Sequence, residues 1–184
     1  MSRKLAADLM IPIDSYPHVQ YWITLKDAIK EFESHQIEVA GKYSLPRVLL
    51  VFDDENNLVG MVRRRDILRG LEPNFLRTMS IPHRKQLFDV EVDPNLVDLS
   101  TGTIRNAMQA QANQPVSEVM QPIGSTVEYD DHMAKIIYKM ISRDYALVPV
   151  IRDGNVIGVV RSVDVFHEIA KLIMQTSVEP PTEE

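Results

Sequence analysis

The chain has 184 residues, with 26 Asp and Glu against 20 Lys and Arg, which gives a formal net charge of −6 at pH 7. This acidic balance disfavours a general nucleic-acid binder, because such proteins need a positive surface for the phosphate backbone. The absence of Cys excludes disulfides, thiol catalysis and cysteine-based metal sites. We expect a cytoplasmic protein without a membrane partner, because the sequence shows neither a signal peptide nor an apolar run of membrane-spanning length.

The first predicted elements are a short extended piece and a helix. The stretch ADLMIPI at 7–13 supplies the extended piece. Thr24 and Asp27 have the spacing of a helix capping box, and apolar residues follow at helical spacing through Phe32. The insertion SHQIEVAGKYS at 34–44 comes next, and its composition assigns it no chemistry.

Two strands and a second helix complete this first set. VLLVF at 48–52 and LVGMV at 58–62 are predicted strands, joined by a tight turn, and a helix begins near Asp66. Residues 72–114 form a linker. Its last part predicts a short helix with Thr103 as the cap.

The same order of elements returns after Pro115. SEVMQPI at 117–123 is extended, and Asp130 is the expected cap of a helix that carries apolar residues from Met133 onward. Strands at 147–152 and 156–160 follow, joined by the turn DGN, and a helix then begins near Asp164. The last residues, 177–184, are expected to form an acidic tail.

The chain therefore contains an internal repeat. Aligning GMVRRRD at 60–66 with GVVRSVD at 158–164 places Asp66 on Asp164. Each copy has the order β-α-β-β-α, and its apolar strands indicate sheets that are covered by helices. One copy is too small to bury a core well alone, so we predict an α+β fold of two packed units.

Residues for catalysis or metal binding are not grouped. None of the five His falls in a helical metal-binding spacing, and the chain has no phosphate-binding glycine loop or nucleophile elbow. We therefore expect no enzyme, no metal and no required cofactor.

The position of Asp164 at the start of a predicted helix has two explanations. A carboxylate at the start of a helix interacts favourably with the free backbone N–H groups and the helix dipole, and spacing alone favours this role. The same position also suits ligand binding, because the helix N-terminus attracts phosphate and a nearby carboxylate accepts ribose hydroxyls.

These motifs resemble a known family. ALVPVIRDGNVIGVVRSVDVF, preceded by VSEVMQPI, resembles a CBS (cystathionine-β-synthase) domain. RVLLVFDDENNLVGMVRRRDIL, preceded by ADLMIPI, resembles a second, more diverged one. The chain thus resembles a tandem CBS pair, or Bateman module. The expected boundaries are a first domain at 5–71, the linker at 72–114, a second domain at 115–176 and the tail at 177–184.

The resemblance implies a fold and a role. In this family two β-α-β-β-α units pack sheet to sheet around a pseudo-two-fold axis. The two clefts between them bind AMP, ADP, ATP or S-adenosylmethionine derivatives in many members, and the module is usually a sensor. We therefore expect an adenosine-containing ligand, most simply AMP, ADP or ATP, and an unidentified protein partner. The alternative is a ligand-free module for interaction or dimerisation.

The resemblance also implies binding residues. The second repeat supplies the stronger set, namely Gln121, Pro122, Ile123, Tyr145, Ala146, Val148, Pro149, Arg161, Ser162 and Asp164. The first repeat supplies a weaker set, namely Ile11, Pro12, Ile13, Arg47, Leu49, Arg63 and Asp66. The second set is favoured because the first repeat has Leu50 in place of Pro149 and carries the insertion.

Both repeats depart from the family at one place. Members often have Ser or Thr three residues before the Asp, whereas this chain has Arg161 and Arg63. An Arg there can hold a phosphate more strongly, fill the cleft or pair with its own Asp. We favour the phosphate role because both repeats carry the Arg, although common descent of the copies explains that equally.

The resemblance also raises the expectation of a homodimer. The last predicted helix has more large apolar residues than a short unit needs inside, namely Phe166, Ile169, Leu172, Ile173 and Met174. A two-fold contact between copies is the usual way to cover such a surface.

Overall fold

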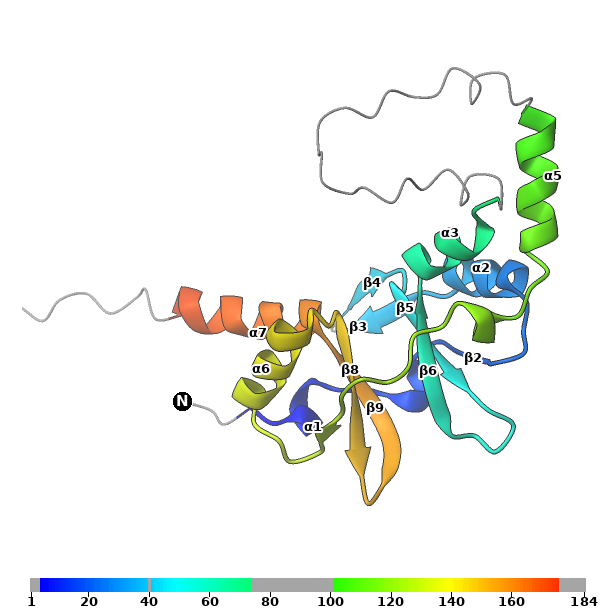
Figure 1. Ribbon diagram of the computed structural model, residues 1–184. Helices are drawn as coiled ribbons and strands as arrows, with labels where there is room; N and C mark the ends of the chain where they lie inside the picture. The colour runs from blue at the N-terminus through cyan, green and yellow to red at the C-terminus, as the bar shows by residue number, and fades with distance from the viewer. Residues whose placement is uncertain (1–3, 40, 74–100, 176–184) are drawn as a thin grey trace, which may run out of the picture. The chain divides into compact units, whose positions relative to one another are not determined.

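The computed structural model describes residues 4–39, 41–73 and 101–175 (Figure 1). The expected tail at 177–184 and most of the expected linker lie outside the described residues. The chain forms two compact units. The Asp164 unit comprises the described residues of Met1–Pro17, Ile37–Ser44 and Ile123–Glu184, and the Asp66 unit comprises those of His18–Gln36 and Leu45–Pro122.

The Asp66 unit is a mixed sheet with helices packed against it (Figure 1). Its elements are β2 (His18–Gln20), α2 (Leu25–Ser34), β5 (Val48–Phe52), β6 (Leu58–Arg63), α3 (Arg64–Leu71), α5 (Thr101–Gln111) and the 3-10 helix η3 (Val116–Glu118). The strand order is β2-β5-β6, with β2 parallel and β6 antiparallel to β5. Leu25 of α2 and Ile67 of α3 share one buried cluster with Leu49 and Val62 of the sheet.

The Asp164 unit repeats this plan with one more paired strand. Its elements are α1 (Ala6–Leu9), β1 (Ile11–Pro12), the 3-10 helix η1 (Ile13–Ser15), β3 (Ile37–Val39), β4 (Lys42–Ser44), β7 (Val127–Glu128), α6 (Met133–Arg143), β8 (Leu147–Arg152), β9 (Asn155–Arg161) and α7 (Ser162–Gln175). The main sheet has the order β1-β9-β8-β7. Ile136 of α6 and Val165 of α7 share a core with Val148 and Val160.

The two repeats exchange their leading segments. Ile11 at the head of the first repeat pairs with Val159 in β9 of the Asp164 unit. Gln121 at the head of the second repeat pairs with Met61 in β6 of the Asp66 unit. Each leading segment therefore pairs with a strand of the other repeat.

The repeated glycine explains how the exchanged segments fit. A Cβ atom added to Gly158 would lie 2.5 Å from the carbonyl oxygen of Ile11, and one added to Gly60 would lie 2.9 Å from that of Gln121. Both distances are too short for any side chain. Glycine at these two places therefore lets a second backbone lie directly against the strand.

The strand predictions and one cap are confirmed, whereas two caps are wrong. Both hairpins form where expected, and the Thr24 hydroxyl accepts a hydrogen bond from the backbone N–H of Asp27 at 3.1 Å. The cap of α6 is His132 rather than Asp130, and its Nδ1 accepts from the N–H of Ala134 at 3.2 Å. Thr103 lies inside α5, because that helix already begins at Thr101.

The insertion of the first repeat forms a small hairpin. β3 and β4 pair antiparallel, with Ile37 opposite Ser44. Ile37 is buried, and Gly41 in the turn has a φ of 74°, which glycine adopts at little cost. This hairpin belongs to the Asp164 unit, although its residues lie within the first repeat of the sequence.

Candidate functional site

The Asp164 unit joins an arginine and an aspartate at one strand end. β9 ends at Arg161 and α7 begins at the next residue, so Asp164 lies in the first turn of the helix. The Nε atom of Arg161 donates to Oδ2 of Asp164 at 2.6 Å, and Nη2 donates to Oδ1 at 2.7 Å. Only 12% of the Arg161 side chain and 14% of the Asp164 side chain are exposed. The two groups therefore form a bidentate ion pair that is largely sheltered from solvent.

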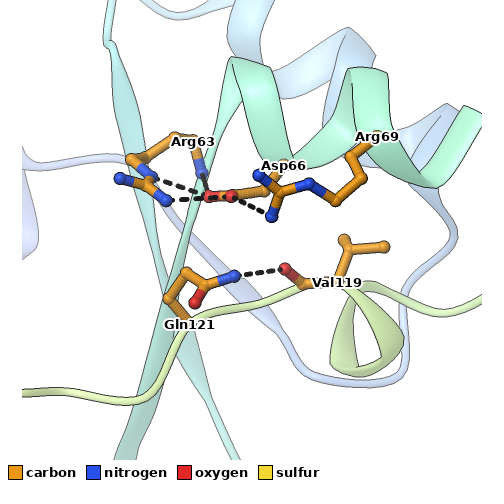
Figure 2. A network of polar contacts seen from close by, with 5 residues as sticks. All are labelled: Arg63, Asp66, Arg69, Val119 and Gln121. Carbon is orange, nitrogen blue, oxygen red and sulfur yellow. Dashed lines mark hydrogen bonds and ion pairs between the residues drawn. The ribbon is translucent and has the colours of Figure 1, made fainter. Parts of the chain in front are cut away.

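The Asp66 unit repeats the ion pair and adds a second arginine (Figure 2). Nε of Arg63 donates to Oδ2 of Asp66 at 2.8 Å, and Nη2 donates to Oδ1 at 3.0 Å. The backbone N–H of Arg63 also donates to Oδ2, at 3.0 Å. Nη1 of Arg69 lies 3.8 Å from Oδ1. The Asp66 side chain is fully buried, whereas 39% of the Arg63 side chain is exposed.

These surroundings control the protonation of two buried groups. Burial by itself would raise the pKa of Asp66, but the hydrogen bonds and charge of Arg63 and the charge of Arg69 outweigh it, so the pKa lies below its usual value. Tyr16 is buried within electrostatic reach of Arg161 and Asp164. Its burial strongly raises the pKa of the phenol, which stays protonated at neutral pH.

The expected binding residues divide between the two units. The Asp164 unit holds Ile11, Pro12, Ile13, Ile123, Tyr145, Ala146, Val148, Pro149, Arg161, Ser162 and Asp164. The Asp66 unit holds Arg47, Leu49, Arg63, Asp66, Gln121 and Pro122. Gln121 and Pro122 were expected beside Asp164, and the exchange of leading segments explains why they lie in the other unit instead.

The start of β8 and the start of α7 are held together in the Asp164 unit. The backbone N–H of Ser162 donates to the carbonyl of Ala146 at 2.9 Å, and both residues are exposed. Tyr145 lies against Gly124 so closely that a Cβ atom there would be 1.8 Å from the phenol oxygen. Ser162 directly follows Arg161, so this hydrogen bond places Ala146 close to the ion pair, and Tyr145 lies next to Ala146 in the sequence.

Two of the expected binding side chains serve the core instead. Leu49 and Val148 are fully buried, and each packs with the helices of its own unit. Their side chains are therefore unavailable to a ligand. When both faces of a strand are buried, its sequence has no apolar–polar alternation. The sequence alone therefore does not show which face of the sheet a given side chain lies on.

Sequence reasoning missed three residues near the ion pairs. Ser44 of β4 accepts a hydrogen bond from Nη1 of Arg161 at 3.0 Å, although 117 positions separate the two residues. No local signal points to this contact. Arg69 lies three residues after Asp66, so helical spacing alone suggests that contact. Tyr16 lies three residues after Ile13, and this short distance in the sequence is the signal that could have added it to the expected segment Ile11–Ile13.

The Asp66 unit also has a cavity of about 480 Å³ beside the end of α3. Its lining comprises Arg69, Gly70, Glu72, Gln114, Glu118, Val119, Met120 and Gln121. Nε2 of Gln114 donates to the carbonyl of Gly70 at 2.7 Å, and Nε2 of Gln121 donates to that of Val119 at 3.4 Å. Figure 2 shows Gln121 and Val119 below the group formed by Arg63, Asp66 and Arg69.

The described residues show neither a metal-binding cluster nor a membrane-spanning helix. Within 4–39, 41–73 and 101–175, no three His, Asp or Glu side chains come together as a metal site requires. Nor does any helix in that part of the chain have the length and apolarity to cross a bilayer.

Comparison with known proteins decides the family. The family model described as CBS domain matches residues 7–73 and 116–171, which together are more than half of the chain. The chain belongs to the CBS-domain family. Modules of this CBS type are generally regulatory rather than catalytic.

One curated relative and several solved structures resemble this CBS chain. The uncharacterized protein MJ1004 of Methanocaldococcus jannaschii is 39% identical over 62 residues, which cover 32% of this chain and 29% of that protein. CBSX2 from Arabidopsis thaliana, a CBS-pair protein, has a TM-score of 0.62 at 17% identity, with 94% of this chain and 99% of that chain covered.

Two of the similar structures contain a nucleotide. CBSX2 in complex with AMP has a TM-score of 0.57 at 16% identity, with 92% of this chain and 98% of that chain covered. The cytosolic domain of the Mg²⁺ channel MgtE in complex with ATP has a TM-score of 0.55 at 18% identity, with 89% and 48% covered. At these identities the likeness shows the shared CBS-pair fold alone.

Proposed function

We propose that this protein is a regulatory module that binds an adenosine-containing ligand of the AMP, ADP or ATP class and signals to a protein partner. The observation that carries the proposal is the Arg–Asp pair at the strand–helix junction of both units, Arg161 with Asp164 and Arg63 with Asp66. S-adenosylmethionine shares the ribose and is a second ligand class for the same contacts. The protein performs no catalysis in this proposal.

The Arg161–Asp164 pair has the chemistry to hold a nucleotide, whereas the fully buried Asp66 leaves only the partly exposed Arg63 guanidinium for a ligand. A carboxylate oxygen that accepts one hydrogen bond from arginine keeps a second lone pair, so ribose hydroxyls can still donate to Asp164. The guanidinium brings a positive charge that suits a phosphate. The pair also keeps Asp164 oriented before a ligand arrives, which lowers the entropy lost on binding.

The edge formed by Tyr145 and Ala146 is the proposed place for the adenine ring. It precedes β8 and is joined to α7 through the bond from Ser162 to Ala146. Pro12 and Ile13 belong to the same unit and complete the proposed set, whereas Ile11 and Pro149 are buried and contribute only their backbone. The AMP complex of CBSX2 and the ATP complex of the MgtE domain support adenine nucleotides as the ligand class for this fold.

The same ion pairs favour a second candidate function. In each unit the arginine donates hydrogen bonds to the aspartate, so the carboxylate has a partner without any ligand. A ligand-free interaction module would need such a partner. In that case Arg161 and Asp164 stabilise the start of α7 and take no part in binding.

We also propose a homodimer through the exposed faces of α6 and α7. Tyr138, Ile141, Phe166, Ile173 and Met174 each have between 66% and 77% of their surface exposed. Ile169 and Leu172 of the expected face are half-buried, and Ile169 packs against the core of its own unit. An isologous contact would cover this apolar face.

A thermal-shift screen of the full chain tests the proposal. The ligands are AMP, ADP, ATP, adenosine and S-adenosylmethionine, with NAD as a bulkier adenosine compound. A ligand that binds only the folded state raises the melting temperature. A shift with AMP or ATP supports the nucleotide function, whereas the absence of any shift across the panel supports the ligand-free module.

A further inference from the structure

The β3–β4 hairpin contributes a side chain to the Asp164 ion pair. Ser44 lies in β4 and is opposite Ile37, whose buried side chain anchors the hairpin. Its hydroxyl oxygen accepts a hydrogen bond from Nη1 of Arg161 at 3.0 Å. The other two contacts of the guanidinium, from Nε and Nη2, go to Asp164. Ser44 thus holds the part of Arg161 that faces away from the aspartate.

The bond to Ser44 competes directly with a phosphate. A serine hydroxyl is a neutral acceptor, whereas a phosphate oxygen carries charge and makes a stronger, charge-assisted hydrogen bond with arginine. Nη1 carries two N–H groups, and a phosphate that takes the one bonded to Ser44 displaces the hydroxyl. Because only 12% of the Arg161 side chain is exposed, the hydroxyl is also part of what limits access to the guanidinium.

We propose that Ser44 is a specificity-determining residue of the Asp164 site, which competes with ligand phosphate for Arg161. This inference rests on the proposed function, since it assumes that Arg161 meets a nucleotide phosphate. Ser44 lowers the affinity for a phosphorylated ligand and leaves the affinity for the nucleoside unchanged. It therefore sets how strongly this site distinguishes AMP from adenosine.

The competition also couples the ligand to the hairpin. If phosphate displaces Ser44, then phosphate binding weakens the attachment of β4, and by thermodynamic reciprocity a loosened hairpin strengthens phosphate binding. The effect is assigned to the Asp164 site, because Ser44 bonds to Arg161 of its own unit.

Calorimetry of the full chain with AMP and adenosine tests the inference. The variants are Ser44→Ala, which removes the hydroxyl, and Ser44→Thr, which keeps it. Ser34→Ala is the matched control, because this exposed serine donates only to the carbonyl of Lys30 in its own helix. Asp164→Asn identifies the part of the isotherm that belongs to the Asp164 site. Hydrogen exchange of the amides at 37–44 reports on the hairpin.

We expect Ser44→Ala to bind AMP about fivefold more tightly, which corresponds to a net contribution of about 1 kcal/mol for one hydrogen bond. Adenosine affinity stays unchanged, and Ser44→Thr and Ser34→Ala behave like the wild type. AMP also speeds exchange at 37–44 in the wild type.

Two results overturn the inference in distinguishable ways. If the wild type binds AMP but Ser44→Ala binds it more weakly, or changes AMP and adenosine equally, then Ser44 is not a competitor and only the inference fails. If neither the wild type nor Ser44→Ala binds AMP, then the proposed function fails and the inference fails with it.

Discussion

Arg161 and Asp164 lie three residues apart at the junction of β9 and α7, and their side chains meet through two hydrogen bonds of 2.6 and 2.7 Å. Arg63 and Asp66 have the same relationship at the junction of β6 and α3. One geometry thus occurs twice in a duplicated chain. Both the proposed nucleotide function and its alternative begin from it, so the first variants to make lie at these four positions.

The two aspartates should differ in their effect on stability. Asp66→Ala should lower the free energy of unfolding by roughly 1–3 kcal/mol, because it leaves Arg63 and its backbone N–H without the buried carboxylate. Asp164→Ala should cost less, since Asp164 keeps some contact with solvent. Urea denaturation of both variants measures the difference. An equal or reversed ranking would show that the burial of Asp66 does not control its contribution.

Asp66 should also give stability a dependence on acidic pH. The pKa of Asp66 is lowered in the folded protein, so its contribution is complete above the unfolded value of about 4 and is lost as the pH falls through the lower folded value. The stability gap between the wild type and Asp66→Asn should therefore be constant from neutral pH to about pH 5 and narrow below about pH 4. Urea denaturation between these values checks it, and a gap that widens in acid would contradict the sign of the shift.

Gly158→Ala should weaken the attachment of the leading segment. The added Cβ atom would lie 2.5 Å from the carbonyl oxygen of Ile11, so β1 must move, at a cost of roughly 1–3 kcal/mol. Thermal unfolding measures this cost, and hydrogen exchange at 5–12 locates it. Asn155→Ala, at an exposed position of the same strand, is the control. A variant as stable as this control would place the leading segment elsewhere.

The sequence was sufficient for the hairpins and helices because their signals are local. Turn residues between apolar runs predict the β5–β6 and β8–β9 hairpins, and the spacing of Thr24 and Asp27 predicts the start of α2. The exchange of leading segments is a long-range pairing, and neither ADLMIPI nor SEVMQPI specifies which of two similar strands it joins. Pairing of Arg161 with its own Asp was open in the sequence, because the rotamer of an arginine depends on tertiary neighbours. The contact with Ser44 comes from an insertion in the other repeat.

The dimer proposal predicts a mass of about twice 21.0 kDa by light scattering at micromolar concentration. Ile141→Lys and Phe166→Lys should shift the protein toward the monomer, because a charge in an apolar contact costs desolvation energy. Leu68→Lys is the matched control, since Leu68 of α3 is equally exposed but lies outside the proposed face. A monomeric wild type contradicts the dimer, and dissociation by Leu68→Lys alone would mean that the face is wrongly assigned.

Arg161→Thr separates the two candidate functions. If Arg161 meets a phosphate, the variant should lose roughly 10- to 150-fold in AMP affinity while adenosine binding stays unchanged, because a charge-assisted contact contributes about 1.5–3 kcal/mol. If Arg161 only blocks ligand access to Asp164, the variant should free the Asp164 carboxylate, and adenosine binding should appear or improve. Calorimetry with both ligands distinguishes these results.

The central claim is that the strand-end ion pair of the Asp164 unit binds an adenine nucleotide. The most direct test is calorimetric titration of AMP into the wild type and into Asp164→Asn, which keeps the shape of the side chain but removes its charge. We predict saturable binding to the wild type and loss of the Asp164 component in the variant, with the variant still folded by circular dichroism. Undiminished AMP binding by a folded Asp164→Asn would contradict the claim.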